Sequence, residues 1–311
     1  MVEDNQIKAQ VSPFAIREGE IKTFDGKDGY VSMNQIVHKI DIGHINEIHF
    51  AILELVNQFE FITSRQLYQM LVIKGIDPKS QDKLNNKLDQ LVKSKILTRY
   101  YFNSDEGKGI YRIYCLEKMG KYLLNSKEIE CKWQQSDNTK PVAMIKKRLA
   151  GNQTLIAYLR KVKAFDEFTV KPALNAKMAG KVFKATGGAV KLTKNNKSIQ
   201  FVFEVIRREK EWEKKLVDKM KLYKDFYENF LPGDSGFAGI PQLILVCEDE
   251  RHMAETFKQI VSNKIEIPKI KLYFTTDLRQ NNETLEDTLV DFKLVDGKYK
   301  MENVELKLLG M

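Results

Sequence analysis

A short apolar run that leads into a long charged helical pattern constrains this fold more than any other stretch of the chain. The run Ile199 to Ile206 has the length and composition of a buried strand, and one carboxylate, Glu204, interrupts it. In the charged stretch that follows without a break, apolar residues recur every three or four positions from Trp212 to Phe230. The sequence therefore predicts a central strand that brings an acidic side chain to the start of a covering helix.

The segments around this stretch predict an α/β unit over residues 151–311. Helical patterns and apolar runs follow one another in the order helix, three strands, helix, strand, helix, strand. This order builds a central mixed sheet whose faces are covered by helices. The charged tail from Glu283 predicts a small hairpin around Asp296-Gly297. The other expected elements are helices at 151–162, after 206 and at 251–262, and strands at 168–177, 188–193, 199–206, 241–247 and 270–275.

The residues before this unit predict a second, mostly helical one over residues 45–125. Its order is three helices, two strands joined by a turn, and a closing helix, which is typical of a winged helix, a variant of the helix-turn-helix. The expected boundaries are 45–59, 63–74 and 78–94 for the helices, 97–102 and 110–116 for the strands, and 117–125 for the last helix. Residues 1–44 predict a loosely structured arm with one short helix near 33–40, and residues 126–150 a polar linker with a basic patch. The fold class is thus α/β (α+β) with two domains.

The predicted winged helix has the side chains that a DNA contact requires. A helix that enters the major groove needs polar and basic groups on its outer face, where they reach phosphates and base edges. The third helix has such groups, and the hairpin and the linker add further cations. The residues predicted to contact DNA are Lys79, Lys83, Asn86, Lys87, Gln90 and Lys93 at the third helix, Arg99, Lys108 and Arg112 at the hairpin, and Lys146, Lys147 and Arg148 in the linker.

The overall charge points to the same kind of partner. The formal net charge is +9, which favours polyanions and double-stranded DNA first among them. The acids Asp82 and Asp89 dilute the basic face of the third helix, so a winged helix used for protein contacts stays open. A second lysine-rich region suits backbone phosphates better than base edges. Its residues are Lys177, Lys181, Lys184, Lys191, Lys194 and Lys197.

Several kinds of site and location are not indicated by the sequence. The three cysteines have no CxxC spacing, which argues against a disulfide framework or a zinc finger and fits a reducing compartment. His38, His44 and His49 lie close together but have no matching Cys or His set, so we expect no metal site and no cofactor. There is no phosphate-binding GxxxxGK[ST] loop, no GxSxG and no HExxH motif. With no signal segment and no membrane-length apolar run, we expect a cytoplasmic protein without a membrane partner.

The order αβββαβ, with an acid at the end of the third strand, resembles the core of the PD-(D/E)xK nuclease-like fold. Together with the winged helix it resembles the replication-relaxation family of plasmids and conjugative elements, over residues 45–280. The residues that support the resemblance are the run 61–116, the segment Phe203 to Glu209, and the pair Lys219 and Tyr223, one helical turn apart. The resemblance implies a role in plasmid replication, DNA relaxation or mobilisation, beside a relaxase or a replication initiator.

The nuclease chemistry of that fold requires groups that this chain lacks. Two carboxylates on neighbouring strands hold a divalent metal, and a lysine two residues after the second one positions the nucleophile. Glu204 stands for the second carboxylate, but Ile206 occupies the lysine position, and Arg207 should point away because strand side chains alternate. The segment 186–189, where the first acid is expected, has none. Glu204 is therefore a vestige, for which we expect an ion pair with Lys219 or Arg208.

Three functions follow from these observations. The first is a non-catalytic DNA-binding protein whose winged helix recognises a site while the nuclease-like domain adds phosphate contacts, protein contacts or dimerisation. The second is a metal-dependent endonuclease whose acids come from segments that the sequence does not identify. The third is a transcription regulator, or a winged helix that serves only as a scaffold for protein contacts.

Overall fold

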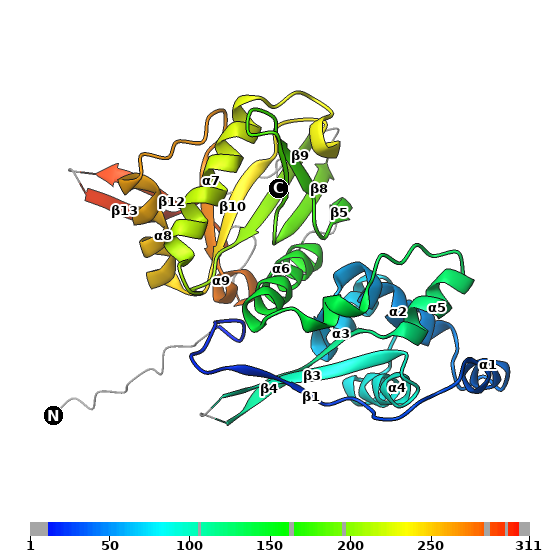
Figure 1. Cartoon of the computed structure of the whole chain (residues 1–311). Coiled ribbons are helices and arrows are strands. Elements are labelled where there is room, and N and C mark those ends of the chain that lie inside the picture. The colour runs from blue at the N-terminus through cyan, green and yellow to red at the C-terminus, as the bar shows by residue number, and fades with distance from the viewer. Residues whose placement is uncertain are drawn as a thin grey trace.

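The computed structural model describes residues 12–104, 107–161, 165–194, 197–282, 287–295 and 298–304. They form a mixed α/β structure with a four-stranded antiparallel sheet near the N-terminus and a seven-stranded mixed sheet after it. Figure 1 shows the two sheets at opposite sides of helix α6, which lies between them. A separate pair of strands, β6 and β7, accompanies the larger sheet.

The N-terminal unit has the three helices and the two long strands that the sequence predicts, with one further strand on each side. Strand β1 pairs with β3, and β2 pairs with β4, so that the sheet order is β1-β3-β4-β2. The arm before residue 45 is thus part of the sheet. The elements are β1 (Ile21–Phe24), α1 (Met33–Asp41), α2 (Glu47–Phe59), β2 (Ile62–Thr63), α3 (Ser64–Ile73), α4 (Gln81–Lys93), β3 (Leu97–Ser104), β4 (Gly107–Leu116) and α5 (Lys118–Ser126).

Local signals fix where these helices begin. The Thr63 hydroxyl accepts from the Gln66 amide at 3.2 Å while the Gln66 side chain accepts from the Thr63 amide, so two backbone donors at the start of α3 are satisfied. Ser80 caps α4 through its hydroxyl alone, which accepts from the Lys83 amide at 3.2 Å. Gly75, with φ of +74°, follows α3, where an L side chain would be strained. Thr63 and Gly75 therefore mark the two ends of α3, close to the predicted bounds 63–74.

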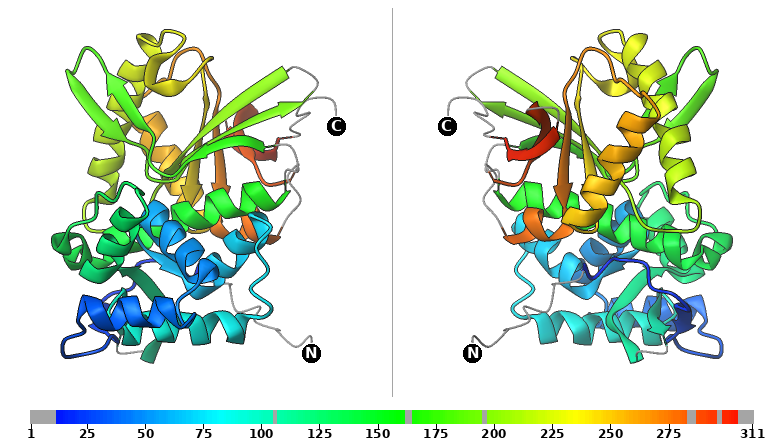
Figure 2. Two further views of the ribbon diagram at one scale, coloured as in Figure 1. Left: turned by 90° about the vertical axis from the view of Figure 1, so that its right-hand side faces the viewer. Right: turned by 90° about the vertical axis from the view of Figure 1, so that its left-hand side faces the viewer.

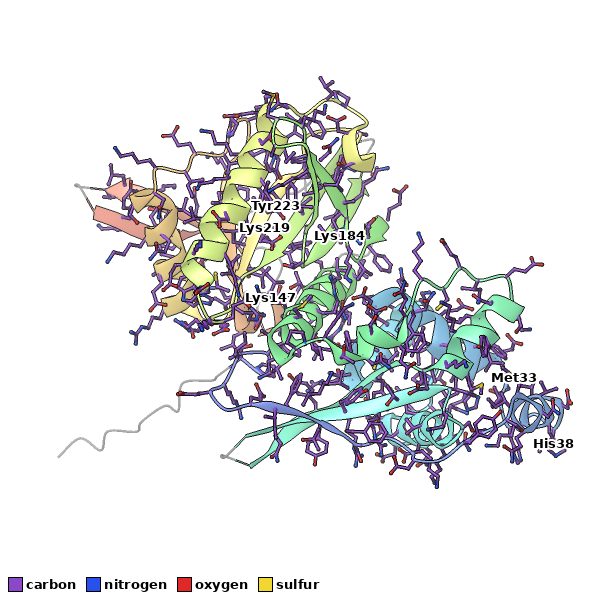
Figure 3. All side chains as sticks on the ribbon, viewed as in Figure 1. Met33, His38, Lys147, Lys184, Lys219 and Tyr223 are labelled. Atoms are coloured by element: carbon purple, nitrogen blue, oxygen red, sulfur yellow. The ribbon has the colours of Figure 1, made fainter. Side chains whose placement is uncertain are left out.

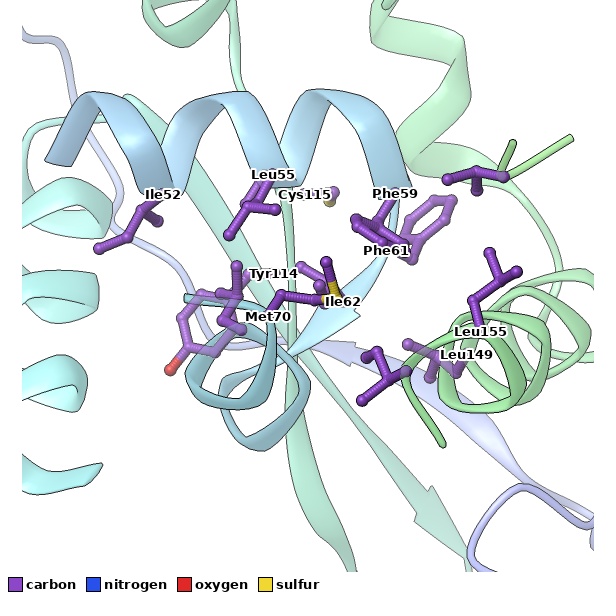
Figure 4. Packing of buried hydrophobic residues seen from close by; sticks show 14 of the residues in the cluster. Ile52, Leu55, Phe59, Phe61, Ile62, Met70, Tyr114, Cys115, Leu149 and Leu155 are labelled. Atoms are coloured by element: carbon purple, nitrogen blue, oxygen red, sulfur yellow. The ribbon is translucent and has the colours of Figure 1, made fainter. Parts of the chain in front are cut away.

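Helix α6 (Val142–Lys161) starts earlier than the sequence predicts, directly after Pro141 and inside the expected linker. It packs on α3 of the N-terminal unit and on β8 and β9 of the larger sheet. Figure 4 shows its residues Leu149 and Leu155 beside Phe59 and Phe61 in one hydrophobic cluster. Because nearly every side of this helix is buried, it lacks the one-sided apolar pattern by which an amphipathic helix is found in a sequence.

The larger sheet has the strand order β13-β12-β11-β10-β9-β8-β5. Strands β5, β8 and β9 are antiparallel neighbours, β9, β10 and β11 run parallel, and β11, β12 and β13 are again antiparallel. The predicted hairpin in the tail is present as β12 and β13. The elements are β5 (Phe165–Thr169), β6 (Ala173–Ala176), β7 (Lys181–Lys184), β8 (Gly188–Lys194), β9 (Lys197–Val205), α7 (Trp212–Glu228), β10 (Gln242–Cys247), α8 (Glu250–Ser262), β11 (Leu272–Thr276), α9 (Asp277–Asn282), β12 (Val290–Val295) and β13 (Lys298–Asn303), with short 3-10 turns η1 (Gln135–Thr139) and η2 (Asp234–Gly236).

Strand alternation divides the core of this sheet between its two faces. Phe201 and Phe203 of β9 face α6, where Tyr158 lies 4.7 Å from the Phe203 ring. The intervening residue Val202 belongs to the other cluster, which α7 and α8 cover. The side views in Figure 2 show α6 between this sheet and the N-terminal unit. Glu204, two positions after Val202, therefore points toward α7 rather than α6.

Two local features differ from the sequence-based expectation. Six residues, 206–211, separate β9 from α7, so the strand does not continue directly into the helix. The expected strand at 168–177 is instead two strands in different sheets, β5 and β6, with Pro172 between them. The sequence between Lys181 and Lys184 pairs with β6 as β7, a strand too short and too charged to be recognised alone.

A buried ion pair connects the segment after β9 to helix α9. Arg207 donates two hydrogen bonds of 2.8 Å to the carboxylate of Asp277, and both side chains are almost fully buried. Ser12, in the N-terminal arm, also donates to Asp277. Arg207 bonds Asp277 of α9, whereas Glu204 accepts from Tyr223 of α7, so the two side chains have different partners. No helix in the described part of the chain has the length and apolarity needed to span a bilayer.

His252 of α8 makes the stability of this unit dependent on pH. Its ring is fully buried, its Nδ1 accepts from the Glu248 amide at 3.3 Å, and the indole of Trp212 meets it edge-on at 4.8 Å. Burial, and then the charges of Arg208 and Arg207, lower the pKa of His252 to about 3. The folded protein thus keeps this imidazole neutral at a pH where an exposed histidine is charged.

We expect the free energy of unfolding to fall as pH drops below 6.5, the ordinary pKa of histidine. Below that pH His252 is protonated in the unfolded chain but stays neutral in the folded protein. The free energy of unfolding therefore decreases by up to about 1.4 kcal/mol per pH unit. Urea unfolding of the wild type and of His252→Gln between pH 5 and pH 7.5 measures this, because the variant should have the shallower dependence. Equal slopes for the two proteins would contradict the assignment.

Candidate functional site

The outer face of α4, together with Lys79 just before the helix, brings together half of the residues predicted to contact DNA. Lys83, Asn86 and Gln90 are exposed, and with Lys79 and Lys87 they surround a hollow of about 420 Å³. Ile48 at the start of α2 and Pro78 also contribute to its wall. The hollow faces solvent with four polar or basic side chains from one helix, which is the arrangement that a groove-binding helix presents. Lys93, at the end of the same helix, is also exposed.

Two groups at this face already have partners. Lys79 lies 3.1 Å from Asp77, and because both side chains are more than half exposed, the pair contributes little to stability. The Gln90 Oε1 lies 3.1 Å from Nε2 of His49, a buried histidine of α2. Burial lowers the pKa of His49, so its ring is neutral at pH 7 and can donate to Gln90 without adding charge.

The cations of the hairpin are largely neutralised. Arg99 is mostly buried and bonds both Asp25, at 2.9 Å, and Asp89 of α4. Arg112 is exposed but also bonds Asp25, at 3.2 Å. Asp25, which follows β1, therefore neutralises part of the positive charge that the sequence predicts to contact DNA. Lys108 pairs with Asn103 in the sheet register, and its side chain lies outside the described residues.

The predicted basic patch of the linker is not a surface patch. Lys146 is only 2% exposed, bonds Glu20 and the carbonyl of Ala15, and has its pKa lowered by burial. Arg148 is buried, donates to the Val170 carbonyl at 3.0 Å, and has its pKa lowered to about 10 by burial.

Lys147, which lies between Lys146 and Arg148 in the chain, bonds Glu209 in the segment before α7. All three belong to α6, and their contacts hold that helix against the arm and the larger sheet.

The second lysine-rich region is only partly free of ion pairs. Lys177 bonds Asp234 at 2.6 Å, and Lys191 lies 3.8 Å from Glu167. Lys181 and Lys184 of β7 are exposed. The side chains of Lys194 and Lys197 lie outside the described residues. The region therefore offers backbone phosphates fewer cations than its sequence suggests.

Glu204 sits at the end of β9 in a cage of hydrogen-bond donors. Tyr223 of α7 donates to Oε2 at 2.7 Å, and Thr186 donates through its amide at 3.2 Å and through its hydroxyl at 2.9 Å. Lys219 adds its charge, with Nζ 3.7 Å from Oε2. Figure 3 shows Lys219 and Tyr223 side by side on α7, next to Lys184. The expected ion pair with Lys219 is confirmed, whereas Arg208 instead bonds Glu248, Asp249 and Glu255.

The surroundings of Glu204 keep the Tyr223 phenol protonated. Its ring is fully buried, and burial together with the neighbouring charge of Glu204 raises the pKa of Tyr223 well above its ordinary value. The phenol is therefore a permanent donor to the carboxylate at physiological pH. With Thr186 and Lys219 supplying the other contacts, both oxygens of Glu204 are occupied by the protein itself.

The segment 186–189 lies where the first nuclease carboxylate is expected, and Thr186 takes that place. Gly187 is required there, because a Cβ would come within 2.7 Å of the Phe203 Cβ. Gly188 has φ of +88°, and a Cβ would meet Leu155 and the Thr169 carbonyl at less than 3 Å. Ile206, at the lysine position, is buried in the apolar cluster under α7. Within the described residues, no three His, Cys, Asp or Glu side chains gather as metal ligands would.

Sequence patterns missed two contributors to these sites. Threonine is common in turns and strands alike, so the residue type of Thr186 does not indicate a contact with Glu204. Its position before the glycine pair is the only signal in the sequence. Asp25 lies far from Arg99 and Arg112 in the chain, and only the pairing of β1 with β3 brings it beside them. The signal for Lys219 and Tyr223 was present as a one-turn spacing on an amphipathic helix.

Comparison with models of protein families gives a match over much of the chain. A family model described as Replication-relaxation matches residues 53–235, which is more than half of the 311-residue chain. The matched region runs from α2 to the turn after α7, so it includes the α4 face, Glu204 and its cage. No curated protein matches the sequence significantly.

Proposed function

Because the chain belongs to the replication-relaxation family, we propose that it binds double-stranded DNA of a plasmid or conjugative element without cutting it. The observation on which this depends is the α4 face, where lysines and amide side chains surround an open hollow. Lysines at such a face contact phosphates, and amides such as Asn86 and Gln90 can bond adenine through both its N6 and N7. The proposed role is in replication, relaxation or mobilisation at an origin.

The order of elements supports a winged helix as the DNA-binding part. Helices α2 and α3 precede α4, and the long strands β3 and β4 follow it as a hairpin. In this arrangement α4 enters the major groove, and the hairpin lies beside it along the backbone. Since Arg99 and Arg112 are bonded to acids, the proposed contact is concentrated on α4, with Lys83 and Lys87 contributing most of the charge.

The topology of the larger sheet supports a nuclease-like scaffold. The αβββαβ order of such a core is present as α6, the antiparallel strands β5, β8 and β9, helix α7, and the parallel strand β10. In active members of such a fold, the carboxylate on the third strand is open to a metal ion. Here Glu204 is 4% exposed and fully engaged by Thr186, Tyr223 and Lys219, which supports a structural role in joining β8, β9 and α7.

We predict that the protein leaves supercoiled plasmid intact with Mg²⁺ or Mn²⁺. A lone carboxylate already saturated by hydrogen-bond donors cannot hold a divalent ion, which takes several oxygen ligands. Incubation of plasmid with the protein, followed by separation of supercoiled and nicked forms, tests this. The matched variant is Glu204→Gln. Metal-dependent nicking by the wild type that this variant loses would establish the endonuclease function instead.

DNA binding itself is tested with fragments of the gene's own locus at several salt concentrations. Binding through α4 lysines should weaken steeply as salt rises, because each phosphate contact releases a counterion. Absence of binding even at low salt would favour a scaffold for protein contacts. A relaxase or replication initiator is the proposed partner, and co-purification from cells that contain the element tests it.

A further inference from the structure

Strand β13 (Lys298–Asn303) ends the seven-stranded sheet. It pairs with β12 on one side, and no strand among the described residues pairs with its other edge. Edge strands expose a row of backbone donors and acceptors that another strand can join. In Figure 1, β13 lies at the end of the molecule remote from α4, so a partner on this edge leaves the α4 face open.

One face of the β12–β13 hairpin is apolar and exposed. The register pairs Phe292 with Met301 and Leu294 with Tyr299, so these four side chains share a face. Phe292 stacks on Phe257 of α8 at 4.1 Å, which anchors the inner part of this face. Tyr299 also meets the Phe257 ring edge-on at 4.9 Å, yet Leu294, Tyr299 and Met301 remain 62%, 50% and 43% exposed. Three large apolar side chains grouped on one hairpin face suggest an interface.

The other face of the hairpin has charges arranged in like-sign rows. The register places Asp291 opposite Glu302 and Lys293 opposite Lys300. Like charges directly opposite each other in a sheet are unfavourable. The diagonal ion pair between Lys293 and Glu302 offsets part of this repulsion. The edge of the sheet therefore presents one negative row and one positive row, two residues apart.

We propose that β13 pairs antiparallel with β13 of a second copy, in the register that sets Met301 opposite Met301. A twofold axis through this pair places Lys300 of each chain opposite Glu302 of the other. The negative row of one copy then continues into the positive row of the other, across four strands. Tyr299 lies opposite Asn303, and the two Met301 side chains cover each other on the apolar face.

Neighbouring registers are less complementary, although an axis at Lys300 would place each Glu302 opposite Lys298 of the other copy. Centring the axis on Lys300 would set Lys300 against Lys300, and centring it on Glu302 would set two carboxylates together. A shift by one residue between copies would turn the apolar face of one toward the charged face of the other. The charges thus select both the partner, a second copy, and the register.

Cysteine cross-linking tests the register directly. The native cysteines Cys115, Cys131 and Cys247 are all buried, so a cysteine added to β13 would be the reactive thiol. Met301→Cys should form a disulfide-linked dimer under a mild oxidant, because directly opposite residues have Cβ atoms about 5 Å apart. Tyr299→Cys, on the same face and strand, should not, because its two copies are four residues out of register. Cross-linking of Tyr299→Cys instead, or of neither variant, would overturn the proposal.

A charge exchange provides the second measurement. Sedimentation equilibrium of the full chain should show a dimer, which Lys300→Glu weakens about tenfold or more because two favourable pairs become repulsive. Adding Glu302→Lys to this variant should restore the dimer with the charges reversed. Lys264→Glu, the same charge change on an exposed residue elsewhere, should have no effect. A monomeric wild type, or a dimer indifferent to Lys300→Glu, would refute the interface.

Discussion

Replacing Lys83 and Lys87 together with glutamate is expected to weaken DNA binding by at least about 100-fold at moderate salt. Both lysines border the hollow on α4, and no acidic side chain among the described residues forms an ion pair with either. Each lysine removed from a phosphate contact also makes the salt dependence shallower by about one unit in a double-logarithmic plot. Fluorescence anisotropy with labelled fragments of the gene's own locus, repeated at several salt concentrations, measures both effects.

The control has the same change in net charge at another place. Lys210, just before α7, and Lys214, within it, are exposed, and α7 covers the larger sheet on the other side of α6 from α4 (Figure 1). Lys210→Glu with Lys214→Glu should reduce affinity only slightly and leave the salt dependence nearly unchanged. If both double variants lost affinity equally, net charge would explain the binding, and α4 would have no special part in it.

The second large effect is expected on stability. Asp277→Ala should lower the free energy of unfolding by about 3–5 kcal/mol, because Arg207 would remain buried without a counter-charge. Both side chains are at most 1% exposed, and Asp277 also accepts from Ser12 in the N-terminal arm. For a chain of this length the loss corresponds to a fall in Tm on the order of 10 °C. Thermal unfolding followed by circular dichroism measures it.

Two further variants separate the ion pair from the packing around it. Replacing both partners with apolar residues, Arg207→Met and Asp277→Leu, should recover much of the loss, since no unpaired charge then remains buried. Asp218→Ala, which breaks an exposed pair with Lys221, should change Tm very little. A loss below about 1 kcal/mol for Asp277→Ala would mean that Arg207 gains another partner or water.

The periodic elements were predictable because their signals are local. The helices at α2, α3 and α4, the buried strand β10 and the cap at Thr63 follow from spacing and capping within a few residues. The resemblance to the replication-relaxation family is confirmed by the match over residues 53–235. The resemblance was detectable because the residues that support it follow one another along the chain, with Glu204 before Lys219 and Tyr223.

The contacts of charged side chains were not predictable in the same way. Lys146 and Arg148 appear in the sequence as part of a basic linker, yet α6 buries both of them. Arg99 and Arg112 appear as free cations, yet Asp25 neutralises them from 74 and 87 positions away. A sequence gives the charge of each residue, but whether that charge faces solvent depends on elements that are distant in the chain.

The sequence by itself determined that a strand brings Glu204 to a helix with Lys219 and Tyr223, and that no lysine stands two residues later. Spacing along one strand and one helix is enough for that, because both have fixed periods. Only the tertiary structure decided which groups besides Lys219 surround the carboxylate. Thr186 reaches Glu204 because β8 and β9 pair and because Gly187 and Gly188 let the backbones approach closely. Such an approach depends on the packing of three elements at once, and no local pattern encodes it.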